Sequence, residues 1–139
     1  MIRTAQAYAA GNADGSALVL TEPLSFWGGI DVETGRIIDR SHANLGQSVA
    51  GTILVMPGGR GSSSSSAVLA ETIRRGTGPA AIVLAVPDPI LTVGAIVAQT
   101  LYRVACPIVV CEIAGIASGD RVRVRADHSD GAQVEWVAR

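Results

Sequence analysis

The sequence predicts an α/β fold in which a central βαβαβ stretch lies between antiparallel strands. Three short apolar runs of buried-strand length alternate with two segments of helical character. The C-terminal part instead alternates apolar and polar residues, as an antiparallel hairpin with one solvated face does. With 139 residues, 48% hydrophobic and 17% charged, the chain is long and apolar enough for a packed core, and we expect residues 1–139 to form a single domain.

The N-terminal part predicts strand, turn and strand. Glycine, asparagine and aspartate in 11–15 are typical of a turn, and Ser16–Leu20 then predicts an apolar strand. The glycine pair beside two aromatic residues in 26–31 predicts a tight, fixed loop. The segment 32–38 predicts a turn that returns into a short strand.

The central stretch predicts three buried strands and two helices. The first helix runs from the serine run to about Arg75, and Gly76 is a natural C-terminal stop. In the second helix, Asp88 is the expected N-cap and Pro89 the first helical residue. The three strands are expected at 52–56, 80–86 and 108–112, and the second helix at about 90–102.

The C-terminal part predicts a hairpin. Arg121, Arg123 and Arg125 are expected on one face of its first strand, with valines on the other, and 133–137 alternates again after a turn at 128–131. Without interleaved aromatic residues, the arginine stripe indicates a solvated face or a subunit contact rather than a nucleic-acid site.

Charge and composition exclude several classes of function. The net charge is −1, which argues against nucleic acid or an anionic membrane as a partner. All eleven basic residues are arginine, so no lysine is present for a Schiff base or a Walker A motif. Met1–Gln6 lacks the apolar core of a signal peptide, and 80–86 is too short to span a bilayer, so we expect a cytoplasmic protein.

The candidate site is the glycine- and serine-rich loop between the first central strand and its helix. In Gly59, Arg60, Gly61 and Ser62, small residues allow close approach of a ligand, and the arginine can contact a carboxylate or phosphate in bidentate fashion. The helix start adds free N–H groups and a positive dipole end. The loop lacks the Gly-Lys-Ser/Thr of a P-loop. The alternative interpretation is a capping turn, because serine also caps helices.

Cysteine and histidine give weaker signals. Cys106 and Cys111 lie on opposite faces of a strand and are too few for a disulfide scaffold or an iron–sulfur cluster, so we expect structural thiols. His42 lies between glycine-rich loops and is a candidate for lining the site. His128 falls in the expected hairpin turn, where a solvated side chain is predicted.

Several stretches together resemble the small, swivelling domain of the aconitase X dehydratases. The resemblance covers about residues 3–115. It is carried by 27–35 (WGGIDVETG), 46–51 (GQSVAG), 59–66 (GRGSSSSS), 74–82 (RRGTGPAAI) and 88–90 (DPI).

The resemblance implies a three-layer β/β/α swivelling domain similar to the C-terminal domain of aconitase. It also implies a hydro-lyase in which a separate large subunit carries the iron–sulfur cluster, no cofactor is bound by this chain alone, and the chain is inactive without its partner. The serine after Arg-Gly, here Ser62, corresponds to the family's proton acceptor, with Ser63 as the alternative in the serine run. Substrate contacts are expected from Gly59, Arg60, Gly61, Ser63, Ser64 and His42.

Three functions stay open at this point. The arginine-only, alanine-rich composition favours cis-3-hydroxy-L-proline, a substrate of bacterial members, over (R)-5-phosphomevalonate, a substrate of archaeal members. Both are small hydroxy acids, and a helix N-terminus binds either a carboxylate or a phosphate. A non-catalytic module of the same fold, which uses the loop to hold an anion or to assemble with a partner, is the third possibility.

Overall fold

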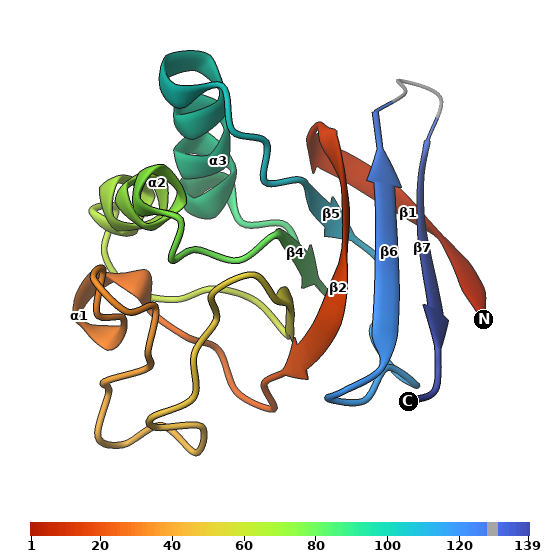
Figure 1. Ribbon diagram of the computed structural model, residues 1–139, viewed down its shortest axis with the longest axis horizontal. Helices are drawn as coiled ribbons and strands as arrows, with labels where there is room; N and C mark the ends of the chain where they lie inside the picture. Colours follow the sequence, from red (N-terminus) through yellow and green to blue (C-terminus); the bar gives the residue numbers. More distant parts are fainter. Residues whose placement is uncertain (128–130) are drawn as a thin grey trace.

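The strands form a closed barrel, and the two long helices pack on one side of it (Figure 1). The computed structural model describes residues 1–127 and 131–139. The strands are Ile2–Ala9 (β1), Gly11–Val19 (β2), Ile53–Met56 (β3), Ala81–Leu84 (β4), Ile108–Val110 (β5), Arg121–Ala126 (β6) and Ala132–Val137 (β7), and the helices are Phe26–Gly29 (α1), Ser65–Arg75 (α2) and Pro89–Tyr102 (α3). Their order around the barrel is β1-β5-β4-β3-β2-β6-β7.

The parallel part of the barrel confirms the predicted βαβαβ stretch. β3 pairs in parallel with β2 and β4, and β4 pairs in parallel with β5. Helices α2 and α3 are the crossovers between these strands. Every residue of β3 and β4 is buried, which explains why both strands read as continuous apolar runs.

The antiparallel part confirms the strands expected on either side. β6 pairs with β2 and β7, and β1 pairs with β7 and β5. Arg121, Arg123 and Arg125 are exposed, while Val122 and Val124 are buried, as the alternation predicts. Most of the turn expected at 128–131, with His128, lies outside the described residues.

The turn predicted at 11–15 is wrong. These residues form the first half of β2 and pair with β6 from Ala126 to Val122. The polar side chains that indicated a turn instead face outward, where Asn12 donates to Asp127 and Asp14 pairs with Arg123. Cross-strand pairing with a distant segment therefore overrides the local turn propensity.

Two clusters of buried side chains meet at the parallel strands. Leu54, Met56 and Ile82 point outward and pack beneath the helices, against residues such as Leu69. Ile53, Val55 and Val83 point into the barrel with the valines of β6. The three-layer β/β/α arrangement stays a prediction, because the two groups of strands share β1 and β2 and close into one barrel.

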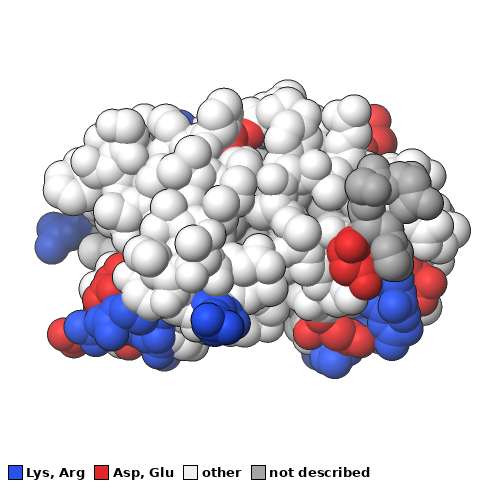
Figure 2. Space-filling model, turned by 90° about the horizontal axis from the view of Figure 1, so that it is seen from above, with Lys and Arg blue, Asp and Glu red and all other residues white. Residues whose placement is uncertain are grey.

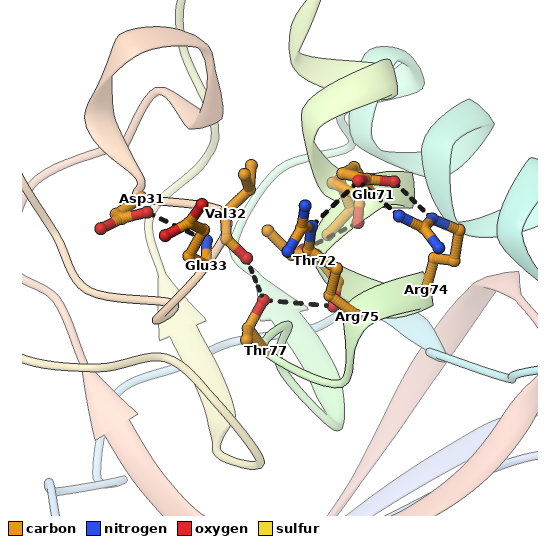
Figure 3. A network of polar contacts seen from close by, with 9 residues as sticks. Asp31, Val32, Glu33, Glu71, Thr72, Arg74, Arg75 and Thr77 are labelled. Carbon is orange, nitrogen blue, oxygen red and sulfur yellow. Dashed lines mark hydrogen bonds and ion pairs between the residues drawn. The ribbon is translucent and has the colours of Figure 1, made fainter.

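The sequence RRGTG at residues 74–78, which spans the end of α2, has a structural role in a network of polar contacts (Figure 3). Thr77 donates a hydrogen bond of 2.7 Å to the carbonyl of Val32, which joins the end of the helix to a distant loop. Hydrogen bonds from Arg74 and Arg75 lower the pKa of Glu71 to about 2. The helix ends at Gly76 in the left-handed conformation, as predicted.

Helices α2 and α3 approach closely, and this packing sets the position of their N-terminal loops. Asp88 caps α3 as predicted, accepting a hydrogen bond of 3.0 Å from the backbone N–H of Leu91. A side chain at Gly94 would come within 2.6 Å of the carbonyl oxygen of Ser66. No helix within residues 1–127 and 131–139 has the length and apolar character needed to cross a membrane.

We predict that Gly94→Ala destabilises the chain. Alanine favours a helix over glycine by about 1 kcal/mol, but an added methyl in a close-packed contact costs about 1–3 kcal/mol. The free energy of unfolding, measured with urea, should fall by about 1 kcal/mol on balance. Gln99→Ala, on the exposed side of the same helix, is the control and should change it little; a Gly94→Ala variant more stable than wild type would contradict the packing.

Candidate functional site

The candidate site lies at the carboxyl ends of β3 and β4, where two loops lead into α2 and α3. Because the strands are parallel, both loops emerge at the same edge, which is where open α/β sheets bind ligands. A pocket of about 220 Å³ lies between them. It is lined by Gly59, Arg60, Gly61, Ser62, Ser65, Pro87, Asp88, Pro89, Ile90 and Leu91.

Two glycines of the loop are packed against other segments. A side chain at Gly59 would collide with the carboxylate of Asp88, and one at Gly61 would collide with the hydroxyl of Ser25. Gly61 also has a φ of 103°, which side-chain-bearing residues rarely adopt. The glycines therefore let the loop lie directly on the N-cap of α3 and on the segment before α1.

The serine run divides into residues with different surroundings. Ser62 is half-buried, lines the pocket and accepts a hydrogen bond of 3.0 Å from the N–H of Ser64. Ser65 is buried and accepts one of 3.1 Å from the N–H of Trp27. Ser63 and Ser64 are exposed and are not among the residues that line the pocket.

Ser62 therefore combines the two interpretations that the sequence left open. Its hydroxyl satisfies an N–H at the start of α2, as in a capping turn, while its side chain also faces the pocket. An N–H that donates to this oxygen favours its negatively charged form.

Arg60 places a positive charge at the pocket. Its side chain is 53% exposed, and Nη2 lies 3.4 Å from Oδ2 of Asp39. The pKa of Asp39 is lowered, chiefly by the hydrogen bond from the Ser41 hydroxyl and then by the Ser41 N–H, with a smaller contribution from Arg60. Asp39 is therefore ionised at neutral pH.

His42 is buried in the turn that follows Asp39. The residue is 4% exposed and does not line the pocket. Its Nδ1 accepts a hydrogen bond of 3.0 Å from the N–H of Asn44 and lies 3.6 Å from Oε1 of Glu22. Within the part of the chain that the structure describes, its Nε2 is buried without a hydrogen-bond partner.

The sequence identified Asp88 only as a helix cap, but the structure also brings it into the pocket. Oδ1 caps α3, while Oδ2 lies over Gly59. The signal was available, because Asp88 follows a buried strand just as the glycine loop follows its neighbour. Asp39 and Ser65 had no comparable signal.

The fold and the loop agree with a comparison against protein families. A family model described as the aconitase X swivel domain matches residues 2–133. This chain belongs to the aconitase X swivel domain family. The resemblance expected from the motifs is thereby confirmed.

Relatives of the aconitase X swivel domain carry two different names. A cis-3-hydroxy-L-proline dehydratase from Pseudomonas aeruginosa is 48% identical over 99 residues, which are 71% of this chain and 17% of that protein. A phosphomevalonate dehydratase small subunit from Methanothermobacter thermautotrophicus is 47% identical over 88 residues, which are 63% of this chain and 67% of that one. The crystal structure of Thermococcus kodakaraensis aconitase X in its holo-form superposes with a TM-score of 0.88 at 32% identity, covering 99% of both chains.

The residues of this swivel domain do not fit an iron–sulfur cluster, the cofactor that the family implies. Such clusters are held by cysteine thiolates, but burial raises the pKa of the Cys106 thiol to about 12. Burial also raises the pKa of Cys111, which is half-buried. Across residues 1–127 and 131–139, no three His, Cys, Asp or Glu side chains are grouped so as to hold a metal ion.

We predict that the two thiols of the aconitase X swivel domain differ in reactivity. Because thiolate is the reacting form, Cys106 should not react with a disulfide reagent at pH 8 until the chain unfolds. Cys111 should react, but more slowly than a thiol of the urea-unfolded chain. Absorbance of the released thiol measures both rates, and rapid reaction of Cys106 in the folded chain would contradict its burial.

Proposed function

We propose that this chain is the small subunit of an aconitase X-type hydro-lyase that dehydrates a small β-hydroxy acid. The observation that carries the proposal is the position of Ser62. Its hydroxyl lines the pocket at the start of α2, directly after the glycine loop and next to Arg60. Family membership supports a dehydratase, and the pocket supports a role for this chain in the reaction.

Ser62 is proposed as the proton acceptor. Dehydration breaks the C–H bond at the α-carbon: the proton passes to Ser62, and the electron pair becomes the new double bond as the β-hydroxyl leaves. The leaving hydroxyl takes up one proton to become water, which balances the proton that Ser62 gained. A serine hydroxyl is a poor base unless its negative form is stabilised. The N–H of Ser64 and the start of α2 favour that form.

Arg60 is proposed to hold the acid group of the substrate, together with the backbone of Gly59 and Gly61. A guanidinium binds a carboxylate or a phosphate in bidentate fashion. Ser63 and Ser64 are proposed to contribute N–H or hydroxyl groups from the rim. His42 is proposed to contribute through the turn that carries Asp39.

We propose cis-3-hydroxy-L-proline as the substrate, with pyrroline-2-carboxylate as the product after tautomerisation. The similarity to the Pseudomonas dehydratase supports this choice. The similarity to phosphomevalonate dehydratase small subunits makes (R)-5-phosphomevalonate the second candidate. The pocket of about 220 Å³ is lined by residues of the two loops and the first residues of α3, and we propose that a partner contacts the part of the substrate that this chain does not.

The proposed partner is a large subunit that carries the iron–sulfur cluster. The absence of charge on α3 supports such a partner, since its 14 residues include no Asp, Glu, Lys or Arg. Exposed apolar side chains on this helix include Val93, Ile96, Val97 and Leu101. A helix that is apolar on all sides is normally buried, and the cores of subunit interfaces are depleted of charge.

The space-filling view supports the same assignment. Figure 2 shows the face at the top of Figure 1, the side on which α3 reaches the surface; most of the centre of this face is uncharged, and charged side chains lie mainly toward its margins. The N-terminal end of α3 also lines the pocket. A partner on this helix would therefore adjoin the substrate site.

We predict that Ser62→Ala abolishes turnover in the complex. Loss of a general base lowers kcat by about 10²–10⁴-fold, while the lost hydrogen bond to Ser64 costs about 1 kcal/mol of stability. The chain, co-expressed anaerobically with a cluster-bearing large subunit, is assayed with both hydroxy acids. Loss in Ser63→Ala alone would move the assignment to Ser63. Ser16→Ala, on an exposed strand position, is the matched control and should retain activity.

We also predict that Leu101→Glu weakens the complex. Leu101 is 65% exposed, so the substitution should leave the isolated chain folded but place a charge in the proposed interface. Ile2→Glu, at an exposed apolar position of β1, is the matched control. Size-exclusion chromatography of each variant with the large subunit measures the effect, and equal loss in both variants would count against an interface at α3.

A further inference from the structure

An ion pair joins the candidate site to a turn that is not part of the pocket. Nη2 of Arg60 lies 3.4 Å from Oδ2 of Asp39, a residue 21 positions earlier in the chain. We propose that Asp39 is a positioning residue that orients Arg60 toward the acid group of the substrate. This inference rests on the proposed function and extends it to a residue outside the pocket.

The carboxylate of Asp39 is itself held in one orientation. Its Oδ1 accepts a hydrogen bond of 2.9 Å from the N–H of Ser41 and one of 2.7 Å from the Ser41 hydroxyl. These bonds leave Oδ2 directed to Arg60. They also lower the pKa of Asp39, so that its carboxylate stays ionised to a lower pH than a free aspartate does.

The turn that carries Asp39 is held by hydrogen bonds on both sides. The N–H of His42 donates to the carbonyl of Asp39 at 3.1 Å, and the imidazole of His42 is buried below it. Oε1 of Glu22 accepts a hydrogen bond of 2.8 Å from the N–H of Ala43. On the other side, the N–H of Ile38 donates to Gly29 at 2.9 Å. The backbone on both sides of Asp39 is therefore held in place by hydrogen bonds.

The consequence for Arg60 is a reduction in conformational freedom before the substrate binds. The guanidinium has five N–H donors, and Asp39 contacts only Nη2, which leaves Nε and Nη1 for an anion. An arginine that is 53% exposed would otherwise lose much of its rotamer freedom on binding. Ordering it in advance strengthens substrate binding without touching the reacting atoms.

The expected effect is on KM rather than on kcat. An exposed ion pair of this kind is weak, so Asp39→Asn is expected to raise KM by only about two- to fivefold. The asparagine keeps the size of the side chain and an oxygen for the Ser41 N–H, so the turn should persist. Asp39→Glu, which restores the charge, should recover part of the affinity.

The test is a double-mutant cycle in the reconstituted complex. Asp39→Asn should raise KM two- to fivefold with kcat little changed, and it should have no effect in an Arg60→Ala background, because the two residues act as one unit. Glu33→Gln is the matched control: it removes one negative charge from an exposed loop position that does not line the pocket, and it should leave KM unchanged. Equal effects of Asp39→Asn with and without Arg60 would overturn the proposal, as would a fall in kcat at constant KM.

The wild-type complex separates this inference from the proposed function. If it dehydrates neither hydroxy acid, both proposed substrates are wrong and no KM can be measured. Whether Arg60 and Asp39 form an ion pair in solution is then tested by an NMR titration of the carboxyl carbon of Asp39 in the full chain. Arg60→Ala should raise the pKa of Asp39 if the pair exists in solution, and an unchanged pKa would overturn the positioning role.

Discussion

Parallel pairing between β3 and β4 is the constraint on which the site depends. It brings two crossover loops, far apart in the sequence, to the same edge of the barrel, and the helices that follow must then pack side by side. Gly94 allows α2 and α3 to approach until backbone meets backbone, and Gly59 allows the first loop to lie on Asp88. The pocket is the space that remains between the two loops, so its shape is a consequence of strand pairing and of two missing side chains.

The central elements could be predicted because their signals are local. Continuous apolar runs, the Asp-Pro pair at the start of α3 and the glycine after α2 each act within a few residues of where they occur. The segment 11–15 was mispredicted because its partner, β6, lies more than a hundred residues away. Closure of the barrel had no local signal either, since it requires β1 to pair with both β5 and β7.

The same distinction separates the parts of the site. The loop with Arg60 and Ser62 was recognisable as a motif, and the structure brings both side chains to the pocket. Asp39 and Ser65 were not recognisable, because each acts through a residue 21 or 38 positions away. Within the serine run, identical side chains take different surroundings according to the direction each faces at the start of α2. Sequence alone does not distinguish these positions, but their hydrogen bonds do. Ser62 accepts one from the N–H of Ser64 and Ser65 accepts one from the N–H of Trp27. Ser66 instead donates its hydroxyl to the carbonyl of Ile90.

The pairing of β1 has a consequence for how the protein is made. β1 leaves the ribosome before its neighbours, yet it pairs with β5 and β7, the latter at the end of the described chain. Until those strands are synthesised, both edges of β1 stay unpaired, and unpaired strand edges favour association with other chains. The barrel therefore cannot close before β7 has been synthesised.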